Sequence, residues 1–176
     1  MSFSSIRRWV TRSATSSVRI APTSSLPTSA EAQFLKGLNF ASGHGSAQDY
    51  VQAAQCYTEA AVQGHARAQL NLATLYKHGQ GVTRDHATAL AWLTRSANLG
   101  NADAQYRLGV QHHLACRTSR LGSGVEGRIE ALKWVRLSAS QGCRGALDAC
   151  EFVALGMTPE EVAESGRRVA AFMPGG

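Results

Sequence analysis

Two residues have types and a spacing that suit metal chemistry. His112 and Cys116 are four positions apart, so on a helix they share one face and offer two ligands to a metal ion. The neighbouring His113 faces another direction. Two ligands do not make a site, because structural zinc needs four and catalytic zinc needs three with a water molecule. We therefore expect no metal site.

The cysteines give no redox motif. The chain has four, and none of them forms a Cys-x-x-Cys pair: Cys56, Cys116, Cys143 and Cys150. Cys143 and Cys150 are seven positions apart, which is two helical turns and too far for a disulfide within one helix. We interpret them as buried thiols. A reducing compartment is the default expectation, and an oxidising one is the alternative.

The sequence also lacks the common motifs of nucleophilic and nucleotide chemistry. Ser138 and Ser140 do not lie in a Gly-x-Ser-x-Gly elbow, and there is no phosphate-binding loop. The run Gly122-x-Gly124-x-x-Gly127 matches a dinucleotide fingerprint by letters only, because it lies between helices and not after a strand. We expect no enzyme and no cofactor. The alternative is a small hydrolase or redox protein that uses Cys116 and His112 with a third polar group.

The elements that position these residues are short helices. From Ala66 to Tyr76 and again from Asp85 to Gly100, apolar residues recur at helical spacing, with Gly79 between the two runs. This pattern predicts a helix-turn-helix unit, which buries little surface alone and needs copies of itself. A shift of 36 positions backward or forward superposes the unit on similar residues, and beyond His112 the spacing becomes 42.

The repeated residues resemble the Sel1-like repeat, a relative of the tetratricopeptide repeat. The central unit carries the motif in full: Ala66-x-Ala68-Gln69-x-x-Leu72-Ala73-x-x-Tyr76-x-x-Gly79-x-Gly81-Val82-x-x-Asp85-x-x-x-Ala89-x-x-Trp92-x-x-x-x-Ala97-x-x-Gly100. The resemblance implies an all-α fold, a right-handed α-solenoid of stacked helix-turn-helix repeats that acts as an adaptor between proteins. It covers units at residues 30–65, 66–101 and 102–143, with a partial fourth at 144–156. A C-terminal capping helix and tail at 157–176 complete the expected organisation.

Most repeated residues have a structural interpretation. Alanines allow close approach of helices, and Tyr76, Trp92 and Trp134 fill the wider gaps. Gly79 suits the left-handed backbone that ends a helix, and Asp49 and Asp85 are placed to cap the next one.

The third unit departs from this pattern. We expect a longer, basic loop at 112–124, with Gly124-Val125 in place of Gly81-Val82. Such a loop suits either partner contact or a tolerated insertion.

The C-terminal part continues with helices. Residues 144–155 predict a fourth helix of the first type, with Ala146 and Cys150 on its buried face. Thr158-Pro159-Glu160-Glu161 predicts the start of the capping helix, with Thr158 as cap and Glu161 in the capping-box position. Arg167 and Arg168 fall near its end, where they oppose the helix dipole.

The N-terminal residues 1–29 are expected to be an organellar transit peptide. They are rich in Ser and Thr and have four arginines and no acid, whereas the rest of the chain has 14 basic and 12 acidic residues. We expect a mitochondrial location, in the matrix or on a matrix-facing complex, with plastid or cytoplasm as alternatives. No stretch has the roughly 18 apolar residues of a membrane span, so we expect a soluble or peripherally attached protein.

Partner proteins are expected on the concave face, which first helices usually line. The candidates on this face are Arg67, Asn71, Thr74, Arg107, Val110 and Gln111, with Leu70 and Tyr106 at the border. Arg117 and Arg120 of the expected basic loop are further candidates. An extended peptide or a helix would lie across them, and an ordinary solvated face is the alternative. We therefore expect a non-catalytic scaffold, such as an accessory or assembly subunit of a respiratory complex or mitochondrial ribosome. RNA contact is a less favoured possibility, and it requires a common surface for Arg117, Arg120, Arg128, Lys133 and Arg136.

Overall fold

A computed structural model describes residues 29–43, 47–118 and 124–172 of the 176-residue chain. The predicted leader therefore lies outside the described residues, except for Ser29. This serine is the N-cap of the first helix, because its Oγ accepts a hydrogen bond from the backbone N–H of Ala32 over 3.2 Å.

The described residues form helices and no strand, which confirms the predicted all-α solenoid. In chain order the helices are α1 (Ala30–Ser42), α2 (Tyr50–Val62), α3 (Ala66–His78), α4 (His86–Asn98), α5 (Ala102–Thr118), α6 (Gly124–Ser140), α7 (Ala146–Ala154) and α8 (Pro159–Phe172). Within the same residues, no helix combines the length and the apolar composition that a membrane span requires.

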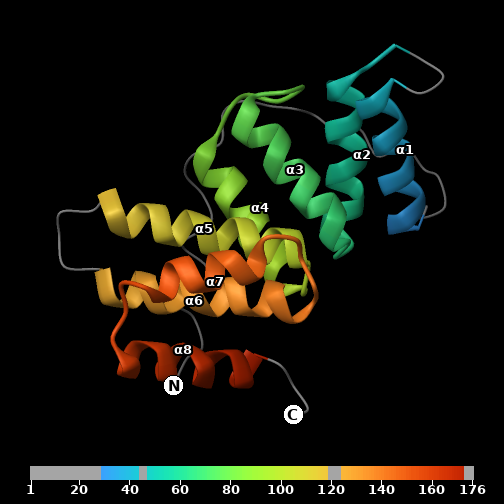
Figure 1. Ribbon diagram of the computed structural model, residues 1–176. Coiled ribbons are helices and arrows are strands. Elements are labelled where there is room, and N and C mark those ends of the chain that lie inside the picture. Colours follow the sequence, from blue (N-terminus) through green and yellow to red (C-terminus); the bar gives the residue numbers. More distant parts are fainter. Residues whose placement is uncertain (1–28, 44–46, 119–123, 173–176) are drawn as a thin grey trace, which may run out of the picture.

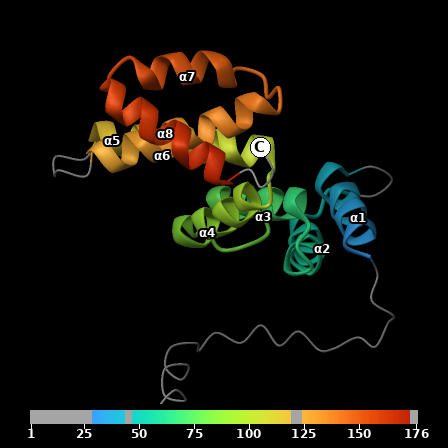
Figure 2. The ribbon, with the colours of Figure 1, turned by 90° about the horizontal axis from the view of Figure 1, so that it is seen from below.

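Helices that follow one another in the chain pack against each other. α1 pairs with α2, α3 with α4 and α5 with α6, and each pair contacts the next through α2 with α3 and α4 with α5. In Figure 1, α5 to α8 run across the view, whereas α1, α2 and α3 run steeply down it. The array therefore turns between the second and third pairs. Both α7 and α8 pack against α6, and in Figure 2 α7 lies to one side of α6 while α8 crosses in front of it.

The helix ends follow the predicted cap chemistry. Asp85 Oδ1 accepts hydrogen bonds from the backbone N–H groups of Ala87 and Thr88, and Asp49 does the same at the start of α2. At the end of α3, Gly79 has φ 70° and its N–H bonds to the carbonyl of Leu75. Glycine reaches this left-handed backbone without the penalty that a Cβ imposes. Each cap satisfies backbone groups that the helix leaves unpaired.

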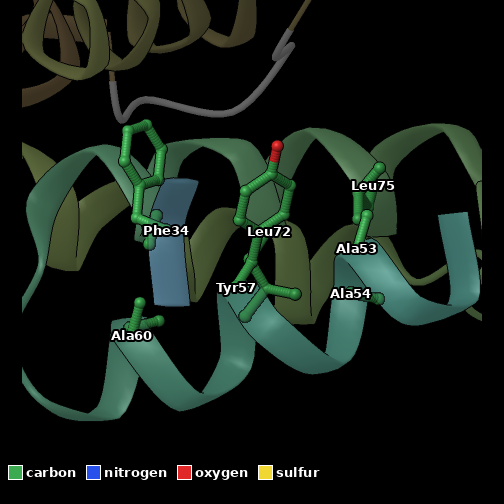
Figure 3. Close-up of a cluster of buried hydrophobic side chains, with 9 residues drawn as sticks. Phe34, Ala53, Ala54, Tyr57, Ala60, Leu72 and Leu75 are labelled. Atoms are coloured by element: carbon green, nitrogen blue, oxygen red, sulfur yellow. The ribbon is translucent and has the colours of Figure 1, made fainter. Parts of the chain in front are cut away.

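The first two pairs share one apolar core, shown in Figure 3. Phe34 and Tyr57 are 1% and 2% exposed, and their ring centroids lie 6.0 Å apart. Alanines 53 and 60 are fully buried beside them, so the backbones of α1, α2 and α3 approach closely around the rings.

Two buried polar contacts recur from repeat to repeat. Gln69 Nε2 donates to the carbonyl of Ala61 over 2.9 Å, and Gln105 Nε2 donates to the carbonyl of Ala97 over 3.1 Å. Serines make the second contact. Ser96 Oγ donates to the carbonyl of Ala66 over 2.7 Å, and Ser138 Oγ donates to the carbonyl of Ala102 over 2.8 Å. The repeated residues thus tie each helix to its neighbour.

The loop predicted at 112–124 is wrong. Residues 112–118 continue α5, and Gly124 and Val125 belong to α6, so this glycine does not form the turn made by Gly81. Each of these two helices has 17 residues, compared with 13 in each of α1 to α4. Residues 112–118 contain neither glycine nor proline, and pairing of α5 with α6 favours their helical state. Residues 119–123 lie outside the described part.

The predicted start of α8 is confirmed. Thr158 Oγ1 accepts from the N–H of Glu161, and Glu161 Oε2 accepts from the N–H of Thr158 over 3.0 Å, which makes a capping box. Ala146 in α7 is fully buried, and Cys150 is half-buried against α6.

Arg168 was predicted to oppose the helix dipole at the end of α8, but its main contacts are ion pairs. This side chain forms ion pairs with Glu126 and Glu130 of α6 and with Glu164 of α8. It therefore fastens α8 to α6 and does not merely oppose the dipole at the helix end. Arg167 pairs with Glu164 one turn earlier on the same helix.

Candidate functional site

A groove of about 300 Å³ opens between α3, α4 and α5. We call it the α3–α5 groove. Its floor is apolar and buried, and Leu70 and Leu93 are its largest floor residues. Its rim is mostly polar and partly or fully exposed, and it includes two exposed apolar residues, Leu90 and Leu114, which are 40% and 55% exposed. The lining residues are Leu70, Ala73, Thr74, Lys77, His86, Ala89, Leu90, Leu93, Tyr106, Arg107, Val110, Gln111 and Leu114.

Hydrogen bonds fix the walls of the groove. Ser96 in α4 is bonded to the first residue of α3, and Gln105 in α5 is bonded to the end of α4. Across the mouth, Arg107 Nη1 donates to Thr74 Oγ1 over 3.2 Å. Because these bonds join all three helices, the groove is a preformed feature of the solenoid.

The groove has a single sign of charge. The cations Lys77 and Arg107 lie in its lining together with His86, whose Nε2 accepts a hydrogen bond from Arg84 Nε, and no carboxylate lies there. Asp85 is next to His86 in the chain, but its oxygens accept from the N–H groups and the hydroxyl at the start of α4. The hydroxyl of Thr88 and the backbone bonds there lower the pKa of Asp85. A ligand in the groove therefore meets positive charge over an apolar floor.

The structure gathers some of the predicted partner-binding residues in this groove and separates others. Those that line it are Thr74, Tyr106, Arg107, Val110 and Gln111. Arg67 and Asn71 face the preceding repeat: the guanidinium carbon of Arg67 lies 5.0 Å from the Phe34 ring centroid, and Asn71 hydrogen-bonds to Tyr57. Arg117 is exposed near the end of α5 and is not among the lining residues. Arg120 lies outside the described residues.

The contribution of α4 to this site was not predicted from the sequence. His86, Ala89, Leu90 and Leu93 come from α4, which lies between the two first helices and forms part of the floor. Leu90 offered a signal, since it is a large apolar residue next to the predicted buried stripe and on the side expected to be solvated. Lys77 and Leu114 were also missed.

A comparison with known protein families identifies the repeats of this solenoid. The family model of the Sel1 repeat matches residues 30–65, 66–101 and 102–143. The chain belongs to the Sel1 repeat family. Proteins with Sel1 repeats are generally scaffolds for protein–protein interaction. The α3–α5 groove is formed by the second Sel1 repeat and the first helix of the third.

Two solved structures share the arrangement of these Sel1 repeats. One is a protective antigen present in uropathogenic Escherichia coli strains that displays an SLR fold. Its sequence is 28% identical to the present one, and the TM-score is 0.63. The match covers 81% of this chain and 30% of the antigen's chain. The other is a Sel1 repeat protein from Oxalobacter formigenes, with 27% identity and a TM-score of 0.62, covering 81% and 58%. The present chain thus spans less than two thirds of either. No curated protein matches it.

His112 and Cys116 lie within the third Sel1 repeat and face α6. A Cβ at Gly127 would lie 2.2 Å from the Cys116 sulfur, so this thiol points at α6. Burial lowers the pKa of His112, and the charges that act on it are those of Glu130 and Lys133. Neither residue lines the groove. The described residues contain no group of three His, Cys, Asp or Glu side chains able to hold a metal ion.

The remaining cysteines of the Sel1 array are free thiols. Cys56 and Cys150 both have a pKa raised by burial, which favours the unreactive protonated form. Cys143 is half-buried, with its sulfur 3.6 Å from Asp103 Oδ1. The prediction of buried thiols, made for Cys143 and Cys150, is therefore confirmed only in part, because both residues are half-buried.

The basic residues proposed for RNA contact are mostly engaged inside the fold. Arg128 donates to both carboxylate oxygens of Glu161, and Lys133 pairs with Glu130 over 3.1 Å. Arg136 donates to the carbonyl of Val162 and to Ser165 Oγ. Arg128 and Arg136 therefore dock α8 on the third Sel1 repeat, whereas Lys133 pairs within α6, and the three side chains do not form an open basic surface.

Proposed function

We propose that this Sel1 repeat protein is a non-catalytic scaffold that acts as an accessory or assembly subunit of a mitochondrial multiprotein complex. Its partner binds in the α3–α5 groove. The observation that carries the proposal is the groove itself, because it combines an apolar floor, a polar rim and walls fixed by hydrogen bonds. Protein-binding surfaces have this anatomy of an apolar centre within a polar border.

Two further observations support the proposal. The basic, acid-free leader at residues 1–29 is typical of mitochondrial import signals. The side chains best suited to chemistry, His112 and Cys116, point at α6 and not into the groove. A respiratory complex or the mitochondrial ribosome would offer such a scaffold many protein neighbours.

Site-specific photocrosslinking in the native cell tests the groove. A benzoyl-phenylalanine is placed at Gln111, on the groove rim, or at Gln52, an exposed position on α2. We expect the full chain to crosslink to one or a few proteins from Gln111 and not from Gln52. Equal products from both positions, or none from Gln111, would contradict binding in the groove.

The leader is tested separately. The full chain and a chain that begins at residue 30 carry the same C-terminal tag and are located by cell fractionation. We expect the full chain in mitochondria and the shortened chain in the cytosol. An equal distribution of the two chains would remove the mitochondrial part of the proposal and leave the groove untouched.

A further inference from the structure

We infer that the α3–α5 groove takes a peptide segment in which one bulky aliphatic side chain is flanked by acidic side chains. This inference rests on the proposed function and names the chemistry of the partner. It follows from the shape of the floor, the identity of the rim residues and the sign of the charge around them.

The floor fits an aliphatic anchor. Leu70 and Leu93 are only 7% and 8% exposed, and the alanines beside them leave a hollow of about 300 Å³. This volume is at the lower end of the range of about 300–1,000 Å³ for ligand sites. It suits a single inserted side chain better than a large cofactor.

The rim leaves apolar surface uncovered. Leu90 and Leu114 stand at the edges of the hollow, 40% and 55% exposed, on α4 and α5. An inserted aliphatic side chain would cover both of them, which favours binding because apolar surface leaves water. Thr74, Gln111 and Tyr106 supply polar groups beside the hollow for the backbone of the segment.

The charge of the rim selects acidic flanks. Lys77 and Arg107 lie on opposite walls, on α3 and α5, and neither forms an ion pair with any described residue. Arg84 adds a third cation nearby, since its Nε lies 3.2 Å from His86 Nε2. A basic segment would find no carboxylate in the lining, whereas an acidic one would pair on both sides.

The same charge argues against the leader of this chain as the occupant. Residues 1–29 carry four arginines and no acid, so the rim repels them. The segment that fits is therefore acidic and comes from another protein.

Selection from a random dodecapeptide library displayed on phage, with the full chain as bait, tests the inference. We expect the enriched peptides to carry Asp or Glu around one Leu, Ile or Met. The leading peptide is then made synthetically and measured by fluorescence anisotropy. Replacing its aliphatic residue by Ala, or its acids by the amides, should weaken binding by about tenfold or more.

Variants of the protein locate the site. Leu90→Asp and the pair Lys77→Gln with Arg107→Gln should each weaken the peptide by about tenfold or more. Lys36→Gln on α1, an exposed lysine outside the groove, is the matched control and should leave binding unchanged. Thermal melts of every variant show that the solenoid is intact.

The outcomes separate the inference from the proposed function. Enriched peptides that are neutral or basic, yet lose binding in Leu90→Asp, would overturn the acidic chemistry and keep the groove. Enriched peptides indifferent to Leu90→Asp and to the basic variants would overturn both. Failure to enrich any peptide would overturn the inference, while the crosslinking from Gln111 still decides the proposed function.

Discussion

Arg107 in α5 donates a hydrogen bond to Thr74 in α3 over 3.2 Å, and this bond joins the first helices of two successive Sel1 repeats across the mouth of the groove. Residues 33 positions apart thus meet at the proposed binding surface. The bond is exposed to solvent, so water competes for both partners. It shapes the groove more than it stabilises the solenoid.

Replacing Thr74 by Val tests this view, because Val keeps the shape of the side chain and removes the hydroxyl. We expect the free energy of unfolding in urea to fall by less than about 1 kcal/mol, since an exposed hydrogen bond contributes little net stability. The Thr74 hydroxyl also donates to the carbonyl of Leu70 within α3 over 3.0 Å. A much larger loss that Arg107→Gln reproduces would show that the bond between Arg107 and Thr74 carries the contact between the repeats.

The buried serines should matter more. Ser138 is fully buried and donates to the carbonyl of Ala102, so Ser138→Ala removes a buried hydrogen bond between α6 and α5 and leaves that carbonyl only its partner within the helix. We expect a loss of about 1–3 kcal/mol in the free energy of unfolding. The control is Ser140→Ala, an exposed serine on the same helix, with an expected change within about 0.5 kcal/mol. Equal effects would contradict a role for burial.

Two helical glycines should respond in opposite ways to alanine. A Cβ at Gly109 would lie 2.5 Å from Val135 Cγ2 and 2.9 Å from the carbonyl oxygen of Ala131, so Gly109→Ala forces α5 and α6 apart. We expect a loss of about 1–3 kcal/mol.

Gly166 in α8 is the matched case. A Cβ there would lie 3.5 Å from its nearest neighbour, Arg136 Nη1, which is an ordinary contact. Gly166→Ala should therefore raise the free energy of unfolding by up to about 1 kcal/mol, because Ala is the better helix former. A gain at Gly109 as well would mean that the two helices are not as close as the structure shows.

Acid should loosen the docking of α8. Hydrogen bonds from Arg128 hold the pKa of Glu161 below its ordinary value, and those from Arg168 do the same for Glu126. A carboxyl whose folded-state pKa is lowered stabilises the fold above its unfolded pKa of about 4.3. This contribution is lost as the pH falls through the lower folded pKa.

Chemical unfolding at several pH values measures the effect. Glu161→Gln should be less stable than the parent chain at neutral pH, and the difference should shrink as the pH falls below about 4. Glu151→Gln, at an exposed position on α7, is the control. A difference for Glu161→Gln that does not change with pH would show that its effect is not one of charge.

Local features of the fold could be read from the sequence. Asp49 and Asp85 cap helices through groups two or three residues away, and Gly79 ends a helix with its own backbone, so the chain near each residue was enough to predict it. The 36-residue recurrence of Gln69 and Gln105 predicted the stacking of repeats, since equal residues make equal contacts. Six of the thirteen residues that line the groove, all on α3 and α5, were named from the sequence because the first helices of such repeats usually line the concave face.

Tertiary structure alone decided the rest. Continuation of α5 through residues 112–118 depends on α6 beside it, and the close contact at Gly109 depends on Val135 across the helix pair. The groove forms where α3, α4 and α5 meet, and Leu90 of α4 is exposed at the edge of the groove. A repeated sequence specifies the contacts within each hairpin, but the angle between hairpins depends on side chains that meet only after stacking.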